Sequence, residues 1–171
     1  MPTLVMDPPP ADFETLLERR RRLGQDRCDE VWDGVLHMAP APLRRHARLQ
    51  AQITVLLEPL ARAAGLEAVA EFNIGEADDY RIPDGGLLAP GPDALYVPSA
   101  ALAVEILSPG DETWAKLPFY AAHGVDELLI FDPERKRFDW LALAGDGYEP
   151  IERSTLIDLS VAELAQRIDW P

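Results

Sequence analysis

Two short apolar segments, residues 101–107 and 127–132, constrain the fold of this chain more than any other feature of its sequence. Each has the length of a buried β-strand, and a stretch with helical character, residues 112–123, lies between them. A strand, a helix and a second strand of these lengths form a right-handed crossover in which the two strands run parallel. The chain is therefore expected to build a mixed sheet crossed by helices, an α/β (α+β) fold class.

The segments on either side of this unit supply further elements. In chain order we expect an extended lead-in over 1–11, a helix over 12–24, a hairpin over 30–38, a helix over 43–64, a strand over 67–75, a short strand over 93–97, an antiparallel pair over 136–143 and 147–153, and a final helix over 160–168. No internal repeat or long linker interrupts this order, and 171 residues suit one domain. We therefore predict a single domain over residues 1–171.

The balance of charged side chains narrows the classes of function. The chain carries 30 Asp and Glu against 16 Lys and Arg, which gives a net charge of −14. This sign argues against a protein that coats nucleic acid generally, because neutralising phosphates requires Lys and Arg. A local basic groove or a bound metal ion can still invert the field at one place, and an excess of carboxylates is what a site for a hard cation requires.

Cysteine content and hydropathy indicate the compartment. The single cysteine, Cys28, allows no intrachain disulfide, which fits a reducing, intracellular setting. The N-terminus has neither the basic start nor the apolar run of a signal peptide, and no apolar segment reaches the ~18 residues of a membrane span. We therefore expect a cytoplasmic protein with no membrane partner.

Glu105 is the exception within the first apolar strand. The period of two along a strand places its side chain on the face of Ala103 and Leu107, opposite the other apolar side chains. An ionised carboxylate there is costly unless it is paired, hydrogen-bonded or bound to metal. The structural interpretation is a glutamate bonded to an arginine or to backbone on a half-open face. The functional interpretation is a metal ligand or a general base at a strand end.

Three other side chains favour the functional interpretation of Glu105. Asp84 follows a proline at the start of an extended segment, and Lys116 lies on the helix after the Glu105 strand. Glu30 opens the N-terminal hairpin. Two carboxylates and a lysine are the groups of metal-dependent phosphodiester hydrolysis, in which oxygen ligands hold Mg²⁺, the metal activates water and the lysine stabilises developing charge.

The order Pro83-Asp84, Glu105, Lys116 resembles the motif of the PD-(D/E)xK nuclease superfamily. More closely, the chain resembles the Uma2 family of restriction-endonuclease-like proteins, also called DUF820. The stretches that carry this resemblance lie between about residues 12 and 150, and they are residues 29–38, 45–46, 79–84, 104–109, 111–116 and 120–127. Each motif is weak by itself, whereas their order and spacing together are fairly specific.

The resemblance implies a restriction-endonuclease-like core, in which a central mixed sheet has helices on both faces. It implies that Asp84 and Glu105 bind Mg²⁺ or Mn²⁺ and that Lys116 is the catalytic lysine. The plain superfamily motif places the lysine two residues after the glutamate, where this chain has Leu107. In the Uma2 family the lysine has moved to the following helix, and Lys116 fits that position. The implied partner is DNA, and the implied assembly is a homodimer or higher homo-oligomer.

Two aspartates, Asp84 and Asp93, are candidates for the metal ligand that accompanies Glu105. Asp93 also follows a proline, and a hairpin between residues 93–97 and 101–107 would place it opposite Glu105. The match of residues 79–84 to the family favours Asp84 as the metal ligand, and the loop after it could still fold Asp84 close to Glu105.

Three further features have a functional and a structural interpretation each. Glu30 is either the N-terminal acid that often joins the site in this superfamily or an exposed hairpin glutamate. His46, at the start of the long helix, is either an accessory group for phosphate binding or proton transfer or a structural histidine. The run of arginines over 19–22 is either a phosphate-binding patch or a solvated helix face. Three scattered histidines and one cysteine indicate no zinc site.

Two hypotheses of function follow. The first is a Mg²⁺-dependent endonuclease that hydrolyses phosphodiester bonds in DNA. The second is a catalytically degenerate, non-enzymatic scaffold or interaction module of the same fold that keeps the acidic cleft. A metal-dependent hydrolase of another phosphate ester is a third, weaker hypothesis.

Overall fold

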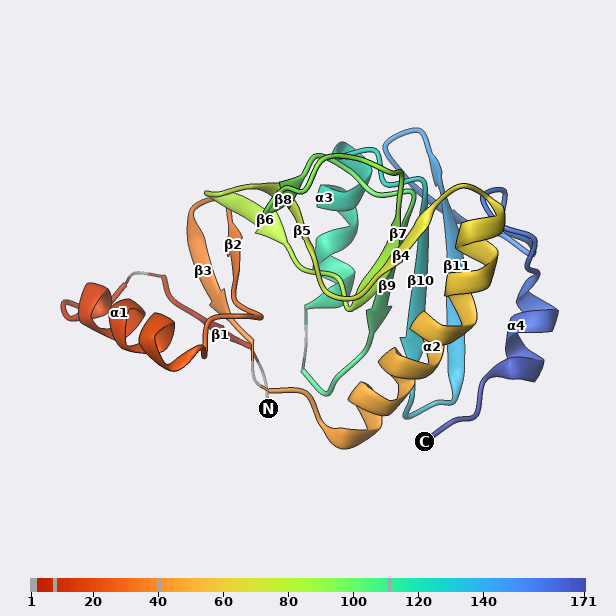
Figure 1. Cartoon of the computed structure of the whole chain (residues 1–171). Coiled ribbons are helices and arrows are strands. Elements are labelled where there is room, and N and C mark those ends of the chain that lie inside the picture. The colour runs from red at the N-terminus through yellow and green to blue at the C-terminus, as the bar shows by residue number, and fades with distance from the viewer. Residues whose placement is uncertain (1–2, 8, 40, 111) are drawn as a thin grey trace.

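Two sheets of six strands each organise the chain, which this computed structural model describes over residues 3–7, 9–39, 41–110 and 112–171 (Figure 1). The strands of the first sheet are, in spatial order, β1 (Leu4–Val5), β3 (Val35–Met38), β2 (Glu30–Trp32), β6 (Asp79–Arg81), β5 (Asn73–Glu76) and β8 (Tyr96–Val97). The strands of the second sheet are β12 (Gly147–Pro150), β11 (Arg137–Ala144), β10 (Glu127–Asp132), β9 (Leu102–Ile106), β7 (Gly85–Leu88) and β4 (Glu67–Val69). The helices are α1 (Phe13–Leu23), α2 (Arg44–Ala63), α3 (Leu117–Ala122) and α4 (Val161–Arg167), and a 3₁₀ turn, η1 (Thr113–Lys116), leads into α3.

The predicted crossover is confirmed. β9 and β10 pair in parallel, and η1 and α3 connect them. Among the described residues the remaining pairings of this sheet are antiparallel, including the predicted pair of β11 and β12. The sheet is therefore mixed, and the predicted α+β fold class is confirmed.

The strands divide between two sheets, where the sequence predicted one central sheet, because the chain crosses repeatedly from one sheet to the other. The predicted strand over 67–75 bends at residues 70–72, so β4 joins the second sheet and β5 joins the first. The chain returns through residues 82–84, where Pro83 has no N–H to continue the pairing of β6. These crossings carry Glu71 and Asp84 to the place where the sheets meet.

Helices cover both faces of the second sheet, as predicted (Figure 1). The apolar side of α2, which includes Leu49, packs against the face of β9 that bears Val104. On the opposite face α3 packs Tyr120 against Ala103, and Glu105 points to this same side. The period-2 prediction for the Glu105 side chain is therefore confirmed.

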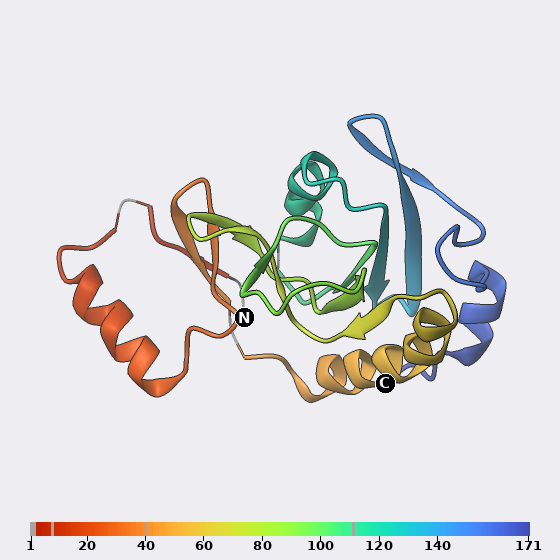
Figure 2. The same ribbon diagram turned by 45° about the horizontal axis from the view of Figure 1, so that its top comes forward.

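The N-terminal segment differs from the expected extended lead-in. Within its described residues, Leu4 and Val5 form β1 and pair with β3 at the edge of the first sheet. The predicted helix over 12–24 is confirmed as α1, which ends at Gly24 in the left-handed conformation. None of the side chains of α1 is fully buried, and the helix stands apart from the rest of the molecule in both views (Figures 1 and 2).

Local signals placed several other elements correctly. The hairpin turn at Asp33 and Gly34 has positive φ angles of 49° and 81° at these residues, as a two-residue turn of this type requires. Ser160 caps α4 through a capping box with Glu163. The predicted helix over 112–123 begins instead as a 3₁₀ turn, because Pro118 belongs in the first turn of an α-helix and not in its interior. In the described part of the chain, no helix is long and apolar enough to cross a membrane.

Candidate active site

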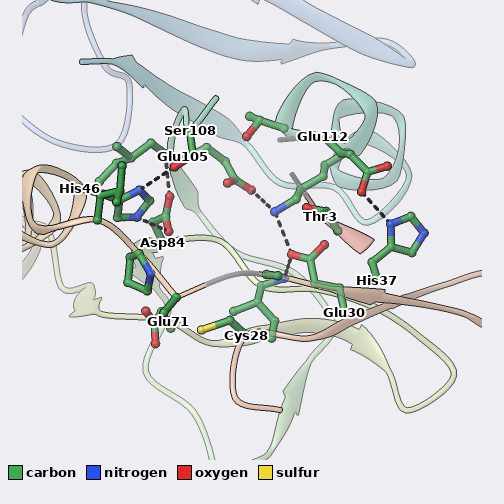
Figure 3. Close-up of a pocket in the computed structure, with 18 of the residues that line it drawn as sticks. Thr3, Cys28, Glu30, His37, His46, Glu71, Asp84, Glu105, Ser108 and Glu112 are labelled. Atoms are coloured by element: carbon green, nitrogen blue, oxygen red, sulfur yellow. Dashed lines mark hydrogen bonds and ion pairs between the residues drawn. The ribbon is translucent and has the colours of Figure 1, made fainter. Parts of the chain in front are cut away.

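A cavity of about 190 Å³ lies where the two sheets meet. Its walls come from both sheets and from the helices beside them. Among the residues that line it are Glu30 from β2, Asp84 before β7, Glu105 from β9 and His46 from α2 (Figure 3). Lys116 from η1 lines it as well. The structure thus brings together all the candidate residues of the sequence except Asp93.

Only one of the two carboxylate oxygens of Glu105 accepts hydrogen bonds from the described residues. Its side chain is 3% exposed, and its Oε1 accepts hydrogen bonds from Lys116 Nζ at 3.1 Å and from the Tyr120 hydroxyl at 2.5 Å. No hydrogen bond from the described residues reaches Oε2, although this carboxylate lines the cavity. Burial raises the pKa of Glu105 to about 8, and the negative charge of Asp84 adds to the shift while Lys116 opposes it. A cation in the cavity would favour the ionised carboxylate.

Lys116 joins the two sheets. Its Nζ lies 2.8 Å from Glu30 Oε1 in the first sheet and 3.1 Å from Glu105 Oε1 in the second. Burial by itself acts against the charge on this ammonium group, yet the carboxylates of Glu105 and Glu30 raise the pKa of Lys116 above its ordinary value. Lys116 therefore reaches back from its turn to Glu105, as the sequence predicted, and carries its charge into the cavity wall.

Glu30 is buried, so the interpretation as an exposed hairpin glutamate is wrong. Its Oε2 accepts a hydrogen bond from Trp32 Nε1 at 2.7 Å, and its Oε1 accepts one from the backbone N–H of Ile82 at 2.8 Å. With Lys116 also on Oε1, both oxygens of Glu30 are used within the protein. This arrangement suits a residue that holds Lys116 in place.

Asp84, and not Asp93, lies beside Glu105. Asp84 Oδ2 accepts a hydrogen bond from the backbone N–H of Ile106 at 2.7 Å, one residue beyond Glu105. Asp93 is exposed and does not line the cavity. The hairpin that favoured Asp93 does not form, because β8 pairs with β5 of the first sheet.

His46 contacts Asp84 directly. Its Nε2 lies 2.9 Å from Asp84 Oδ1, and its Nδ1 lies 3.3 Å from Ser108 Oγ (Figure 3). The histidine is largely buried, and Gln50, one helical turn further along α2, donates to the backbone oxygen of Asp84 at 2.7 Å. α2 therefore fixes the position of Asp84 through two side chains.

The donor set of the cavity fits a hard divalent cation. Among the described residues, no group of three or more His, Cys, Asp or Glu side chains is arranged as a complete metal cage. Mg²⁺ does not need one, because it is usually bound through one or two carboxylates with water and substrate phosphate. Glu105 offers an open oxygen, and Asp84 lines the cavity with two oxygens that also contact His46 and the N–H of Ile106. The three acids Glu30, Asp84 and Glu105 outweigh the single cation Lys116.

Sequence reasoning missed two contributors to this site. The first is Tyr120, whose hydroxyl donates to Glu105. Its position four residues after Lys116, on the same side of a helix, is the signal that could have found it. The second is His37, which lines the cavity and stacks on Trp32 at 4.1 Å between ring centroids. Its Nδ1 lies 2.8 Å from Glu112 Oε2.

The fold itself is that of a nuclease-like α+β protein. A crystal structure described as "a putative nuclease belonging to DUF820 from Anabaena variabilis" superposes with a TM-score of 0.65, over 81% of this chain and 90% of that one. The two sequences are 17% identical, so the likeness concerns the fold. The family model Uma2, described as "Putative restriction endonuclease", matches residues 10–169. The chain belongs to the Uma2 family, which confirms the resemblance. No curated protein matches the chain.

Proposed function

We propose that this chain is a Mg²⁺-dependent endonuclease of the PD-(D/E)xK type that hydrolyses phosphodiester bonds in DNA. The observation that carries the proposal is the buried carboxylate of Glu105, with one oxygen tied to Lys116 and Tyr120 and the other left to the cavity beside Asp84. This second oxygen faces the cavity instead of a protein donor. An open carboxylate oxygen next to a second carboxylate suits a ligand of a hard divalent cation.

In this proposal each residue has one task. Asp84 and Glu105 hold Mg²⁺ or Mn²⁺, which neutralises charge on the phosphate and lowers the pKa of a bound water. Lys116 places its ammonium group at the cavity wall, where negative charge develops during phosphodiester hydrolysis. Glu30 positions Lys116, and His46 positions Asp84.

The test is cleavage of supercoiled plasmid DNA by the purified protein in Mg²⁺ or Mn²⁺. Glu105→Gln keeps the volume of the side chain and removes its charge, so we expect at least a ~100-fold loss of nicking. Glu149→Gln, at an exposed position on β12, is the matched control and should leave nicking unchanged. Equal trace activity in the wild-type protein and in Glu105→Gln would sink the enzyme proposal.

One observation favours the second hypothesis, a non-enzymatic scaffold of the same fold. No group of three or more His, Cys, Asp or Glu side chains among the described residues could hold a metal ion, and Lys116 is held by two acids at once. Calorimetry with Mn²⁺ separates the hypotheses. An enzyme of this type should bind the ion in a manner that depends on Asp84 and on Glu105, whereas the absence of such binding supports the scaffold.

The remaining expectations stay predictions. Light scattering in solution tests the homodimer or higher homo-oligomer that the resemblance implies. Fractionation of cells tests the cytoplasmic location. Profiling the protein against other phosphate esters separates an endonuclease from the third hypothesis, a hydrolase of smaller substrates.

A further inference from the structure

The cations of this acidic chain are concentrated in three short segments. Residues 19–27 contain five arginines and one aspartate, residues 44–48 contain three arginines and no acid, and residues 134–137 contain three cations and one glutamate. Together they hold eleven of the 16 Lys and Arg of a chain whose net charge is −14. A separation of charge of this kind is typical of proteins that bind a polyanion.

Two of the three segments adjoin the cavity in sequence, and a contact ties the third segment to the start of α2. Cys28, which follows the first segment, and Leu43 and His46, at the start of α2, line the cavity. Arg45 Nη2 donates to Glu134 Oε1 at 3.0 Å, which ties the turn between β10 and β11 to the start of α2. That turn, the start of α2 and the loop after β9 lie along the same lower edge of the molecule in Figure 1.

One arginine of α1 anchors its neighbours. The Arg20 guanidinium donates through Nε and Nη2 to the carboxylate of Asp29, at 3.0 and 2.7 Å. Asp29 is buried and directly precedes Glu30 of the cavity. This bidentate pair ties the last turns of α1 to Asp29, one residue before Glu30 of the cavity, although no side chain of the helix is fully buried.

Several of these cations remain available for a partner. Arg21, Arg22 and Arg44 are exposed, and no ion pair within the described part of the chain involves them. Arg45 and Arg48 do have acidic partners, Glu134 and Asp169, but these pairs are solvent-exposed and contribute little to stability. A strong polyanion can replace such partners.

We infer that residues 19–27, 44–48 and 134–137 form a basic rim on which the backbone of a nucleic acid lies, so that one phosphodiester enters the cavity between Cys28 and the start of α2. The inference rests on the proposed function and adds the path of the substrate. Nucleic acid fits better than an anionic membrane surface, because residues next to two of the basic segments line a concave cavity whose carboxylates and lysine suit a phosphodiester.

The test compares two double charge reversals in the full chain carrying Glu105→Gln, which prevents turnover. Arg22→Glu with Arg44→Glu changes the rim, whereas Arg62→Glu with Arg167→Glu changes exposed arginines outside it. Both pairs alter the net charge equally. Binding to a fluorescent DNA duplex is measured in EDTA at graded salt concentrations. We expect the rim variant to bind at least ~10-fold more weakly and to lower the slope of log K against log salt by about two, while the control matches the parent.

Three outcomes would overturn the rim: equal weakening by both variants, no binding of DNA by the parent, or tighter binding of the parent to phosphatidylserine vesicles than to DNA. Failure of the enzyme proposal looks different. A wild-type protein that binds DNA through the rim but never nicks it disproves the nuclease and leaves the rim intact. A rim variant that binds normally while the wild type nicks DNA disproves the rim alone.

Discussion

Glu105 and Glu127 are both buried in neighbouring parallel strands, with 3% and 1% of their surface exposed, and the protein treats them in opposite ways. Glu105 has one oxygen held by Lys116 and Tyr120 and the other left to a cavity. Both carboxylate oxygens of Glu127 accept hydrogen bonds. Among the described residues, none of the donors to them is a cation.

The partners of Glu127 come from the C-terminal part of the chain. Its Oε2 accepts from Trp140 Nε1 at 2.9 Å and Ser154 Oγ at 2.8 Å. Its Oε1 accepts from the backbone N–H of Thr155 at 2.7 Å and from the Thr155 hydroxyl at 3.0 Å. Glu127 thereby holds the loop before α4 against β10, an interior strand of the second sheet.

The difference teaches that burial of a carboxylate does not by itself indicate function. A buried glutamate saturated by neutral donors stabilises the fold, because each hydrogen bond to a charged group contributes about 1.5–3 kcal/mol. A buried glutamate with an oxygen open to a cavity keeps that oxygen available for a ligand. Hydrogen-bond saturation, and not exposure, separates the two.

The largest effect is expected on the free energy of unfolding, where the two glutamates should differ. Glu127→Gln places an amide N–H₂ against donors, so we expect the free energy of unfolding to fall by about 3 kcal/mol. Glu105→Gln should change it by less than about 1 kcal/mol, since its oxygen can still accept from Lys116 and Tyr120. Urea denaturation in EDTA measures both. A larger loss for Glu105→Gln than for Glu127→Gln would break the comparison.

The next effect concerns the group that orients Glu105. Tyr120→Phe removes the hydroxyl that helps tie down Oε1, so we expect Mn²⁺ to bind about 10–100-fold more weakly in calorimetry. Tyr148→Phe is the matched control, because its hydroxyl donates to the backbone oxygen of Val125 at 2.8 Å and contacts no carboxylate of the site. Equal losses in the two variants would mean that Tyr120 acts only on the fold.

A smaller effect depends on pH in the metal-free protein. Burial raises the pKa of Glu105 to about 8 from an ordinary value near 4.5, so the folded protein holds a proton that the unfolded chain releases. The stabilisation is complete below pH ~4.5 and is lost as the pH rises through 8, with a slope of at most about 1.4 kcal/mol per pH unit from this group. Unfolding in EDTA from pH 5 to 9 measures the slope, which Glu105→Gln should reduce. An unchanged slope in that variant contradicts the assignment.

The smallest expected effect separates the two candidate aspartates. Asp93→Asn changes an exposed side chain away from the cavity, so we expect a change in stability within about 0.5 kcal/mol and unaltered Mn²⁺ binding. Asp84→Asn should weaken Mn²⁺ binding, because Asp84 lies beside Glu105. The reverse ranking in calorimetry would move the metal site to Asp93.

The sequence by itself determined the individual strands, turns and helix ends of this protein. Apolar strands of the right length predicted the parallel pair of β9 and β10, and the period of two predicted the face on which Glu105 lies. Glycine and capping signals predicted the turn at Asp33 and the start of α4. The turn, the cap and the face of Glu105 depend on neighbours within a few residues, so periodicity and turn chemistry suffice. The pairing of β9 with β10 follows from the short helical crossover between them.

Only the tertiary structure decided which residues meet. The division into two sheets follows from bends at residues 70–72 and 82–84, and these same bends bring Asp84 to Glu105 and leave Asp93 outside. Glu30 reaches Lys116 across the junction of the sheets, from a hairpin far away in the sequence. No local pattern encodes such contacts, because they depend on which strand edges pair, and pairing is settled by the packing of the whole chain.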